Sequence, residues 1–131
     1  MANITIYISV RQKSNGTYYL HLSDSEGHTG DDNLFTTGAP GDVVTWTIST
    51  ALANTTTSIG NIYEKNQAGN YDVFSDGPKA KNDGTGDWTG TVNPQITTQE
   101  TEAYAIDYNV TVNGSTTTHT DDPDLQIDPP G

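Results

Sequence analysis

Two acidic loops hold the residues whose types and spacing are best suited to chemistry. Asn82-Asp83-Gly84-Thr85-Gly86-Asp87 and Asp121-Asp122-Pro123-Asp124 each place several side-chain oxygens within a few residues. Calcium takes about six to eight oxygen ligands in flexible geometry, and loops of this composition suit it. Asp and Asn are also ordinary turn formers, because their side chains bond nearby backbone groups. The acidic loops therefore leave two alternatives open, simple turns or a calcium site whose ligands are Asp83, Asp87, Asp121, Asp122 and Asp124.

The three histidines, His21, His28 and His119, are a second group of potential metal ligands. Imidazole is the commonest protein metal ligand. Their spacing, however, does not match that of a chelating pair on one element. We interpret them as solvated surface side chains, with a shared metal site as the alternative.

Catalytic motifs are missing from the sequence. It contains no Gly-x-Ser-x-Gly nucleophile motif, and no pair of carboxylates stands out from the others. The absence of cysteine removes disulfides, thiol catalysis, cysteine-ligated zinc and blue copper together. We therefore predict a protein that is not an enzyme and assign no catalytic or cofactor-binding residue.

Aromatic residues offer a third kind of site, in which exposed rings stack on sugars or on a partner protein. Trp46 alternates with aliphatic residues in its run, as Tyr104 and Tyr108 do in theirs, so we expect all three in the core. The candidates for ligand stacking are Trp88, Tyr71 and Tyr19.

The charge balance limits the partners. Five Lys and Arg residues against 17 Asp and Glu give a net charge of −12. Nucleic acids and anionic membranes are excluded, because a phosphate backbone is bound through many basic side chains. No apolar run is long enough to cross a bilayer, and no basic and apolar leader opens the sequence. We expect a cytoplasmic protein by default, with a secreted or cell-surface location as the alternative.

Short alternating runs of apolar and polar residues predict the elements that position these side chains. The clearest strands are 4–11, 18–23, 43–49 and 104–112, and Asn15-Gly16 predicts a hairpin between the first two. No helical period is sustained. We predict one all-β domain over residues 1–131, a two-sheet sandwich of seven to nine strands. Val44, Trp46 and Ile48 should pack against Tyr104, Ile106 and Tyr108, with loops over 24–42 and 67–87.

Self-association is the remaining expectation. A sandwich has free sheet edges that pair with other chains unless charge, Pro or bulges block them. The first strand carries little charge apart from Arg11, whereas the last is followed by Asp128, Pro129 and Pro130. The Thr-rich strand segments suit contact between copies of the chain.

Several segments, in chain order, resemble the motifs of a known family. Gly41 to Trp46 resembles the G-D-x-V-T-W/F strand of cupredoxins and cupredoxin-like β-sandwiches, and Tyr104 to Tyr108 resembles their late Y-x-Y/F-x-C strand. Phe74 to Pro78, Trp88 to Val92 and Asp122 to Ile127 resemble the F-S-x-G-P loop, W-x-G-x-V strand and D-P-x-I-x-I ending of uncharacterised bacterial cupredoxin-like proteins. The resemblance implies a Greek-key sandwich of cupredoxin-like or immunoglobulin-like type.

The copper ligands of that family are absent. Tyr108 stands where the late strand would present its Cys, residues 109–118 contain neither His nor Met, and Met1 is the single methionine. Type-1 copper needs two His, one Cys and usually an axial Met. We therefore predict a cupredoxin-like module without copper that has a binding or structural role. A calcium-dependent protein and a carbohydrate-binding module remain as alternatives.

Overall fold

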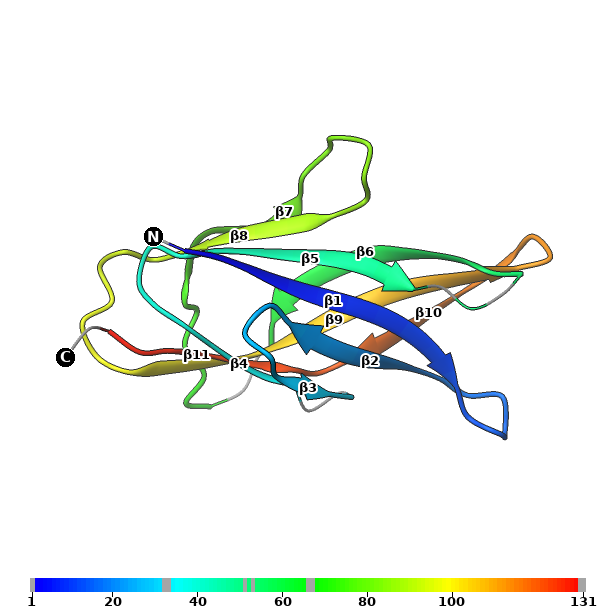
Figure 1. Cartoon of the computed structure of the whole chain (residues 1–131), viewed down its shortest axis with the longest axis horizontal. Helices are drawn as coiled ribbons and strands as arrows, with labels where there is room; N and C mark the ends of the chain where they lie inside the picture. The colour runs from blue at the N-terminus through cyan, green and yellow to red at the C-terminus, as the bar shows by residue number, and fades with distance from the viewer. Residues whose placement is uncertain (1, 32–33, 51, 53, 66–67, 130–131) are drawn as a thin grey trace.

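The chain folds into two β-sheets packed face to face, without a helix in the described residues (Figure 1). The computed structural model describes residues 2–31, 34–50, 52, 54–65 and 68–129. The eleven strands are β1 (Asn3–Gln12), β2 (Tyr18–Asp24), β3 (Thr29–Gly30), β4 (Phe35–Gly38), β5 (Val43–Thr50), β6 (Thr56–Glu64), β7 (Phe74–Ala80), β8 (Trp88–Val92), β9 (Glu100–Val112), β10 (Ser115–Asp121) and β11 (Asp124–Ile127).

The first sheet has six strands in the order β3-β2-β1-β5-β8-β7. Strand β1 pairs antiparallel with β2 and parallel with β5, with Ile6 opposite Trp46. Because successive side chains of a strand point to opposite faces, Ile4, Ile6, Ile8 and Val10 all enter the core. The predicted β1–β2 hairpin is confirmed.

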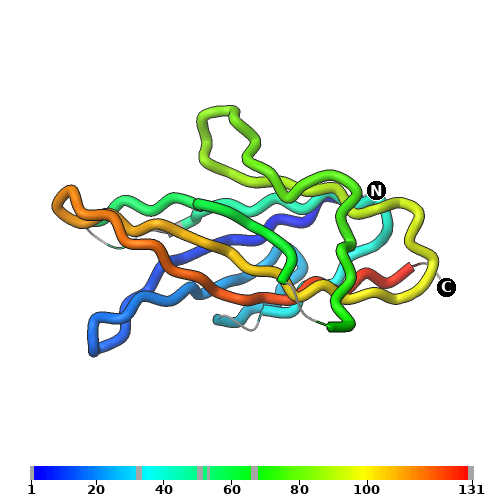
Figure 2. Tube along the Cα trace, turned by 180° about the vertical axis from the view of Figure 1, so that it is seen from behind, coloured from blue at the N-terminus to red at the C-terminus, as the bar shows by residue number. Residues whose placement is uncertain are grey.

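The second sheet is organised by the long strand β9. On one edge β9 pairs with β11 through residues 100–103 and with β10 through residues 106–112. On its other edge it pairs with β6 over residues 104–111, and β4 adds to β11 in parallel. The turn between β9 and β10 lies at the end of the molecule opposite the start of β1, as Figures 1 and 2 show.

The core fills the space between the two sheets, as the alternation of residues predicts. Trp46 and Tyr104 are fully buried, with ring centroids 5.7 Å apart, and Phe74 lies at the same distance from Trp46. The predicted packing of the 43–49 strand against β9 is confirmed at this pair.

Several predicted details are wrong. The described residues form eleven strands rather than seven to nine, and the predicted loop over 67–87 contains the whole of β7. Its Gly77 and Pro78 read as a turn, but β7 is an edge strand with two register shifts against β8, and an edge tolerates Pro. The predicted loop over 24–42 likewise contains β3. Leu34 and Phe35 predict a short strand or a hydrophobic plug within that loop, and β4 begins at Phe35.

The prediction that the first and last strands form free sheet edges is also wrong. Strand β1 lies between β2 and β5, and β11 lies between β9 and β4, so both are internal. Pro130, which was expected to guard the last strand, lies outside the described residues. Strand β6 begins at Thr56 and carries a register shift between Ile59 and Asn61. This bulge brings Ile59 and Ile62, three positions apart, to the same buried side.

Candidate functional site

The first acidic loop forms the tip of the β7–β8 hairpin. Asp83 Oδ1 accepts hydrogen bonds from the backbone N–H and the Oγ1 hydroxyl of Thr85. These bonds hold the pKa of the Asp83 carboxyl below its usual range. The N–H of Asp87 donates to Thr85 Oγ1 at 3.2 Å. The loop is thus closed by its own side chains.

The second acidic loop sends its carboxylates to different neighbours. Asp121 Oδ2 accepts the backbone N–H of Leu20 at 2.7 Å, and Asp122 lies 3.5 Å from Lys65 Nζ. Burial raises the pKa of the half-buried Asp124. In the part of the chain that the structure describes, neither acidic loop brings three potential metal ligands within reach of one ion.

One such group forms elsewhere, in the turn between β2 and β3. Ligand atoms of Asp24, Glu26 and His28 lie within 4.8 Å of one another. The buried carboxylate of Asp24 also accepts the Thr36 hydroxyl at 2.8 Å, the His28 Nδ1–H at 2.9 Å, and the backbone N–H groups of Glu26 and His28. Since its lone pairs are already engaged, we interpret Asp24 as the anchor that ties this turn to β4.

The D-x-E-x-H spacing of this group was present in the sequence but was not recognised. Asp24 falls on the buried side of β2, where alternation predicts an apolar residue, and that polar exception was the available signal. The other two histidines lie apart from it. His21 Nδ1 is 3.2 Å from Asp31, and the His119 ring lies 5.1 Å from the ring of Tyr18 and 5.4 Å from that of Tyr108.

The three candidate stacking residues come from different parts of the fold. Tyr71 is 39% exposed in the segment before β7. Trp88 is half-buried opposite Trp46 and packs against the core. Tyr19 is half-buried, with Lys13 Nζ 5.7 Å from its ring centroid. Within the described ranges, no ring contact joins any two of the three.

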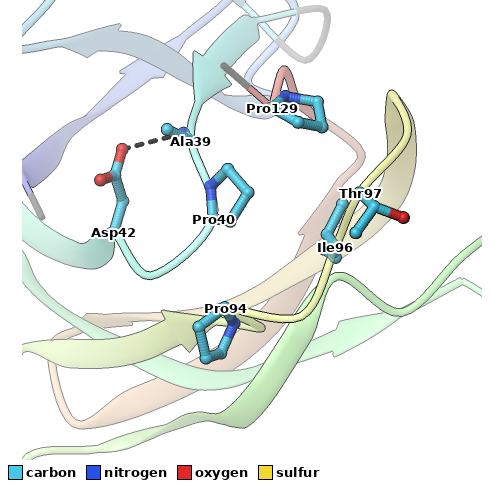
Figure 3. A pocket seen from close by; sticks show the side chains of 7 residues that line it. All are labelled: Ala39, Pro40, Asp42, Pro94, Ile96, Thr97 and Pro129. Carbon is cyan, nitrogen blue, oxygen red and sulfur yellow. Dashed lines mark hydrogen bonds between the residues drawn. The ribbon is translucent and has the colours of Figure 1, made fainter. Parts of the chain in front are cut away.

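A pocket of about 530 Å³ opens at the end of the molecule where β1 begins (Figure 3). Its walls are largely apolar: Ala39, Pro40, Asp42, Pro94, Ile96, Thr97 and Pro129. Asp42 is the one charged residue among them. Its two carboxylate oxygens accept the backbone N–H groups of Ala2 and Ala39 at 2.9 Å each. The Asp42 carboxylate therefore connects the N-terminal segment with the loop between β4 and β5 beside the pocket.

A buried carboxyl group lies inside the sandwich. Glu102 is fully buried on the same side of β9 as Tyr104. Its Oε1 accepts the Val73 N–H at 2.8 Å, whereas Oε2 has no partner among the described residues. Burial raises the pKa of Glu102 to about 8, and Asp72 and Glu64 add to the rise, while the Val73 hydrogen bond opposes it. Glu102 is therefore largely protonated at neutral pH.

The outer side of the second sheet is a polar face formed by residues that lie far apart in the sequence. The cross-strand register places nine outward side chains in three rows. We call them the hydroxyl face: Thr56, Thr111 and Thr116; Ser58, Asn109 and Thr118; Asn61, Asp107 and Thr120. Hydrogen bonds of 2.7, 2.7 and 2.6 Å join the β9 and β10 members of the rows.

The hydroxyl face lies in a region almost free of charge. Segments 54–63 and 108–120 contain no Asp, Glu, Lys or Arg, in a chain with a net charge of −12. Asp107 is the single ionisable member of the face, and it accepts hydrogen bonds from Thr120 and, at 3.2 Å, from the Tyr63 hydroxyl. We call segments 54–63 and 108–120 together the uncharged region. Its signal in the sequence was a run of Thr in two strands, but only the register against β9 joins them.

Comparisons with known proteins identify the chain's family and fold. A model of the family described as "Domain of unknown function (DUF8788)" matches residues 2–118. The crystal structure of the inclusion body protein PixA from Burkholderia cenocepacia J2315 matches with a TM-score of 0.55. The alignment is 10% identical and covers 98% of this chain and 95% of that one, so the two share a fold. No curated protein matches the chain. In the described residues we also find no helix that is long and apolar enough to span a membrane.

Proposed function

The chain belongs to the DUF8788 family, and from that premise we propose that it is a non-enzymatic structural module that assembles with copies of itself through the uncharged region. The carrying observation is that two strands on either side of β9 present uncharged side chains in a strongly acidic molecule. Segments 54–63 and 108–120 are neutral, whereas the whole chain carries −12. A contact through these segments brings few carboxylates together, and like charges across an interface oppose binding.

The fold supports this proposal. PixA is described as an inclusion body protein, and its structure matches nearly the whole of both chains. The arrangement of polar groups supports a role without catalysis as well. In the described residues, the carboxylates of Asp24 and Asp42 are held by backbone and hydroxyl donors.

The cupredoxin-like relationship is part of the same proposal. The Gly41–Trp46 and Tyr104–Tyr108 motifs lie on β5 and β9, which face each other through Trp46 and Tyr104. A scaffold shared with cupredoxins but without their copper ligands suits a structural role. The solved structure of a more similar family member, compared strand by strand with cupredoxins, tests whether the connections follow a Greek key.

Sedimentation velocity tests the proposed assembly. We expect the mean sedimentation coefficient to rise with protein concentration and to rise further in high salt, because salt screens the repulsion between acidic copies. A single monomeric species over a wide concentration range at both salt levels contradicts the proposal.

A matched pair of variants tests where the contact lies. Ser58→Glu with Thr118→Glu adds two charges to the hydroxyl face and should abolish assembly. Ser14→Glu with Thr17→Glu adds the same charge at the exposed tip of the β1–β2 hairpin and should leave assembly unchanged. Equal effects of the two pairs would point to overall charge rather than to the uncharged region.

A further inference from the structure

We propose that two copies of the chain pair through strand β6, antiparallel about a two-fold axis, so that their two β9–β6 ladders become one continuous sheet. This inference rests on the proposed self-assembly and names its contact. A strand at a sheet edge has one unpaired row of N–H and C=O groups, which another strand can bind. The partner is a second copy of this chain.

Most edges of the two sheets are too short or are obstructed. In the described residues the edge strands are β3 and β7 in the first sheet and β4, β6 and β10 in the second. Strands β3 and β4 have two and four residues. Strand β7 has two register shifts against β8, and it also contains Pro78 and Lys79. Pro, Lys and bulges are the features that keep natural edges from pairing.

The outer edge of β10 faces the other sheet of the same molecule. Asp121 at its end accepts the N–H of Leu20 in β2 at 2.7 Å. The His119 and Tyr18 rings meet with centroids 5.1 Å apart. These contacts join β10 to β2 across the opening between the sheets and occupy the side that a second chain would need.

Strand β6 also approaches β5 and β7 of the first sheet, but in the described residues no hydrogen bond or ring contact joins it to them. It has nine residues, neither Pro nor Lys, and one charged side chain, Glu64, at its last position. Its pairing in the described structure is with β9 alone. Ile59 and Ile62 point inward, and the remaining side chains are polar, small or the exposed Tyr63. The strand therefore offers an edge without exposing aliphatic side chains.

The direction of the backbone groups follows from the register. The N–H of Lys65 donates to the carbonyl of Ala103 at 3.0 Å, so odd-numbered residues of β9 form the bonded pairs with β6. Thr56 and Ser58 stand opposite Thr111 and Asn109 and turn their N–H groups toward β9. The intervening Thr57 consequently turns its N–H outward.

The position of the charge on β6 places the centre of the contact near Thr57 and Ser58. A two-fold axis there keeps the two Glu64 carboxylates on opposite sides of it, and no other charge lies between 54 and 63.

Single substitutions within one row of the hydroxyl face test the pairing. Ser58 on β6 and Thr118 on β10 flank Asn109 in the same row, and both are exposed. In sedimentation velocity, Ser58→Glu should weaken the association by about tenfold or more, because the two carboxylates meet at the axis. Thr118→Glu adds the same charge on β10, which lies on the opposite side of β9 from β6. It should change the association constant less than about twofold. Circular dichroism checks that both variants are folded.

Two further measurements complete the test. An equimolar mixture of Ser58→Glu and Ser58→Lys should associate more tightly than either variant alone. Amide hydrogen exchange should show that the Thr57 N–H gains protection with rising wild-type concentration. If Thr118→Glu weakens the association as much as Ser58→Glu does, the β6 pairing is overturned. The same holds if Ser58→Glu leaves the association unchanged while the wild type assembles. In both cases the proposed function still stands. A wild-type chain that stays monomeric overturns both.

Discussion

Trp46 Nε1 donates a hydrogen bond to the Tyr104 hydroxyl at 3.2 Å, between two fully buried rings that belong to opposite sheets. The bond joins β5 and β9, so the two sheets are connected here by a polar contact as well as by packing. Burial raises the pKa of Tyr104 far above its usual value. The Tyr104 hydroxyl is therefore protonated at neutral pH and accepts the Trp46 N–H as a neutral group.

Removal of this hydroxyl should destabilise the fold. Tyr104→Phe leaves the Trp46 N–H buried without an acceptor, at a cost of about 1–3 kcal/mol in the free energy of unfolding. Urea denaturation measures this loss in the free energy of unfolding. Tyr108→Phe is the matched control, because the Tyr108 hydroxyl is buried without a partner and its removal should be close to neutral. Equal losses in both variants would show that the loss comes from removing a buried hydroxyl group and not from breaking the hydrogen bond to Trp46.

Glu102 should make the protein more stable in mild acid. Its pKa of about 8 in the folded protein lies above the value of 4.5 for a solvated Glu side chain. The contribution is fully present below pH 4.5 and is lost as the pH rises through about 8, at up to about 1.4 kcal/mol per pH unit. Glu102→Gln keeps an acceptor for the Val73 N–H and should flatten the pH dependence of unfolding between those limits.

Glu100→Gln is the control for that experiment, since Glu100 lies on the same strand but is half-buried. Its pH profile should follow that of the wild type. If Glu102→Gln keeps the wild-type slope, the buried carboxyl is not the titrating group.

The Asp24 turn should depend on its carboxylate. Asp24→Asn replaces an oxygen that accepts hydrogen bonds from Thr36 and His28 with an amide that donates. We expect a loss of about 1–3 kcal/mol in thermal or urea unfolding. Glu26→Gln alters an exposed neighbour in the same turn and should cost less than about 0.5 kcal/mol. A reversed order would indicate that the turn is held by Glu26 instead.

Calcium should leave the melting temperature unchanged within about one degree, and so should a chelator. The carboxylates of Asp83, Asp121 and Asp122 contact Thr85, Leu20 and Lys65 rather than one another. An ion that bound only the folded chain would stabilise it by mass action. Differential scanning calorimetry with calcium and then with chelator is the measurement. A rise of several degrees with calcium would restore the calcium-dependent alternative.

Residue alternation predicted the strands that carry the core and failed where local chemistry opposed it. The runs of β1, β2, β5 and β9 were recognisable because apolar side chains recur at every second position. Strand β7 was missed because Gly77 and Pro78 are turn residues by type and occur here in an edge strand. The bulge at Gly60 also breaks the period of two in β6.

The candidate sites were harder to predict, because they depend on register. The acidic loops look like ion sites when read along the chain, yet their carboxylates find separate partners in space. The hydroxyl face needs three strands aligned residue by residue, and Glu102 reads as a surface residue until β9 turns it inward beside Tyr104. No local pattern contains that information.

The hydrogen bond from Leu20 to Asp121 spans 101 positions of the chain. During synthesis the Leu20 N–H emerges long before the Asp121 carboxylate that accepts its hydrogen bond. Strand β1 must likewise wait for β5 before its parallel ladder can form. We therefore expect a chain truncated after the β9–β10 turn to leave the β2 edge uncapped. The nascent chain on the ribosome thus exposes unpaired strand until β5 and Asp121 have both emerged.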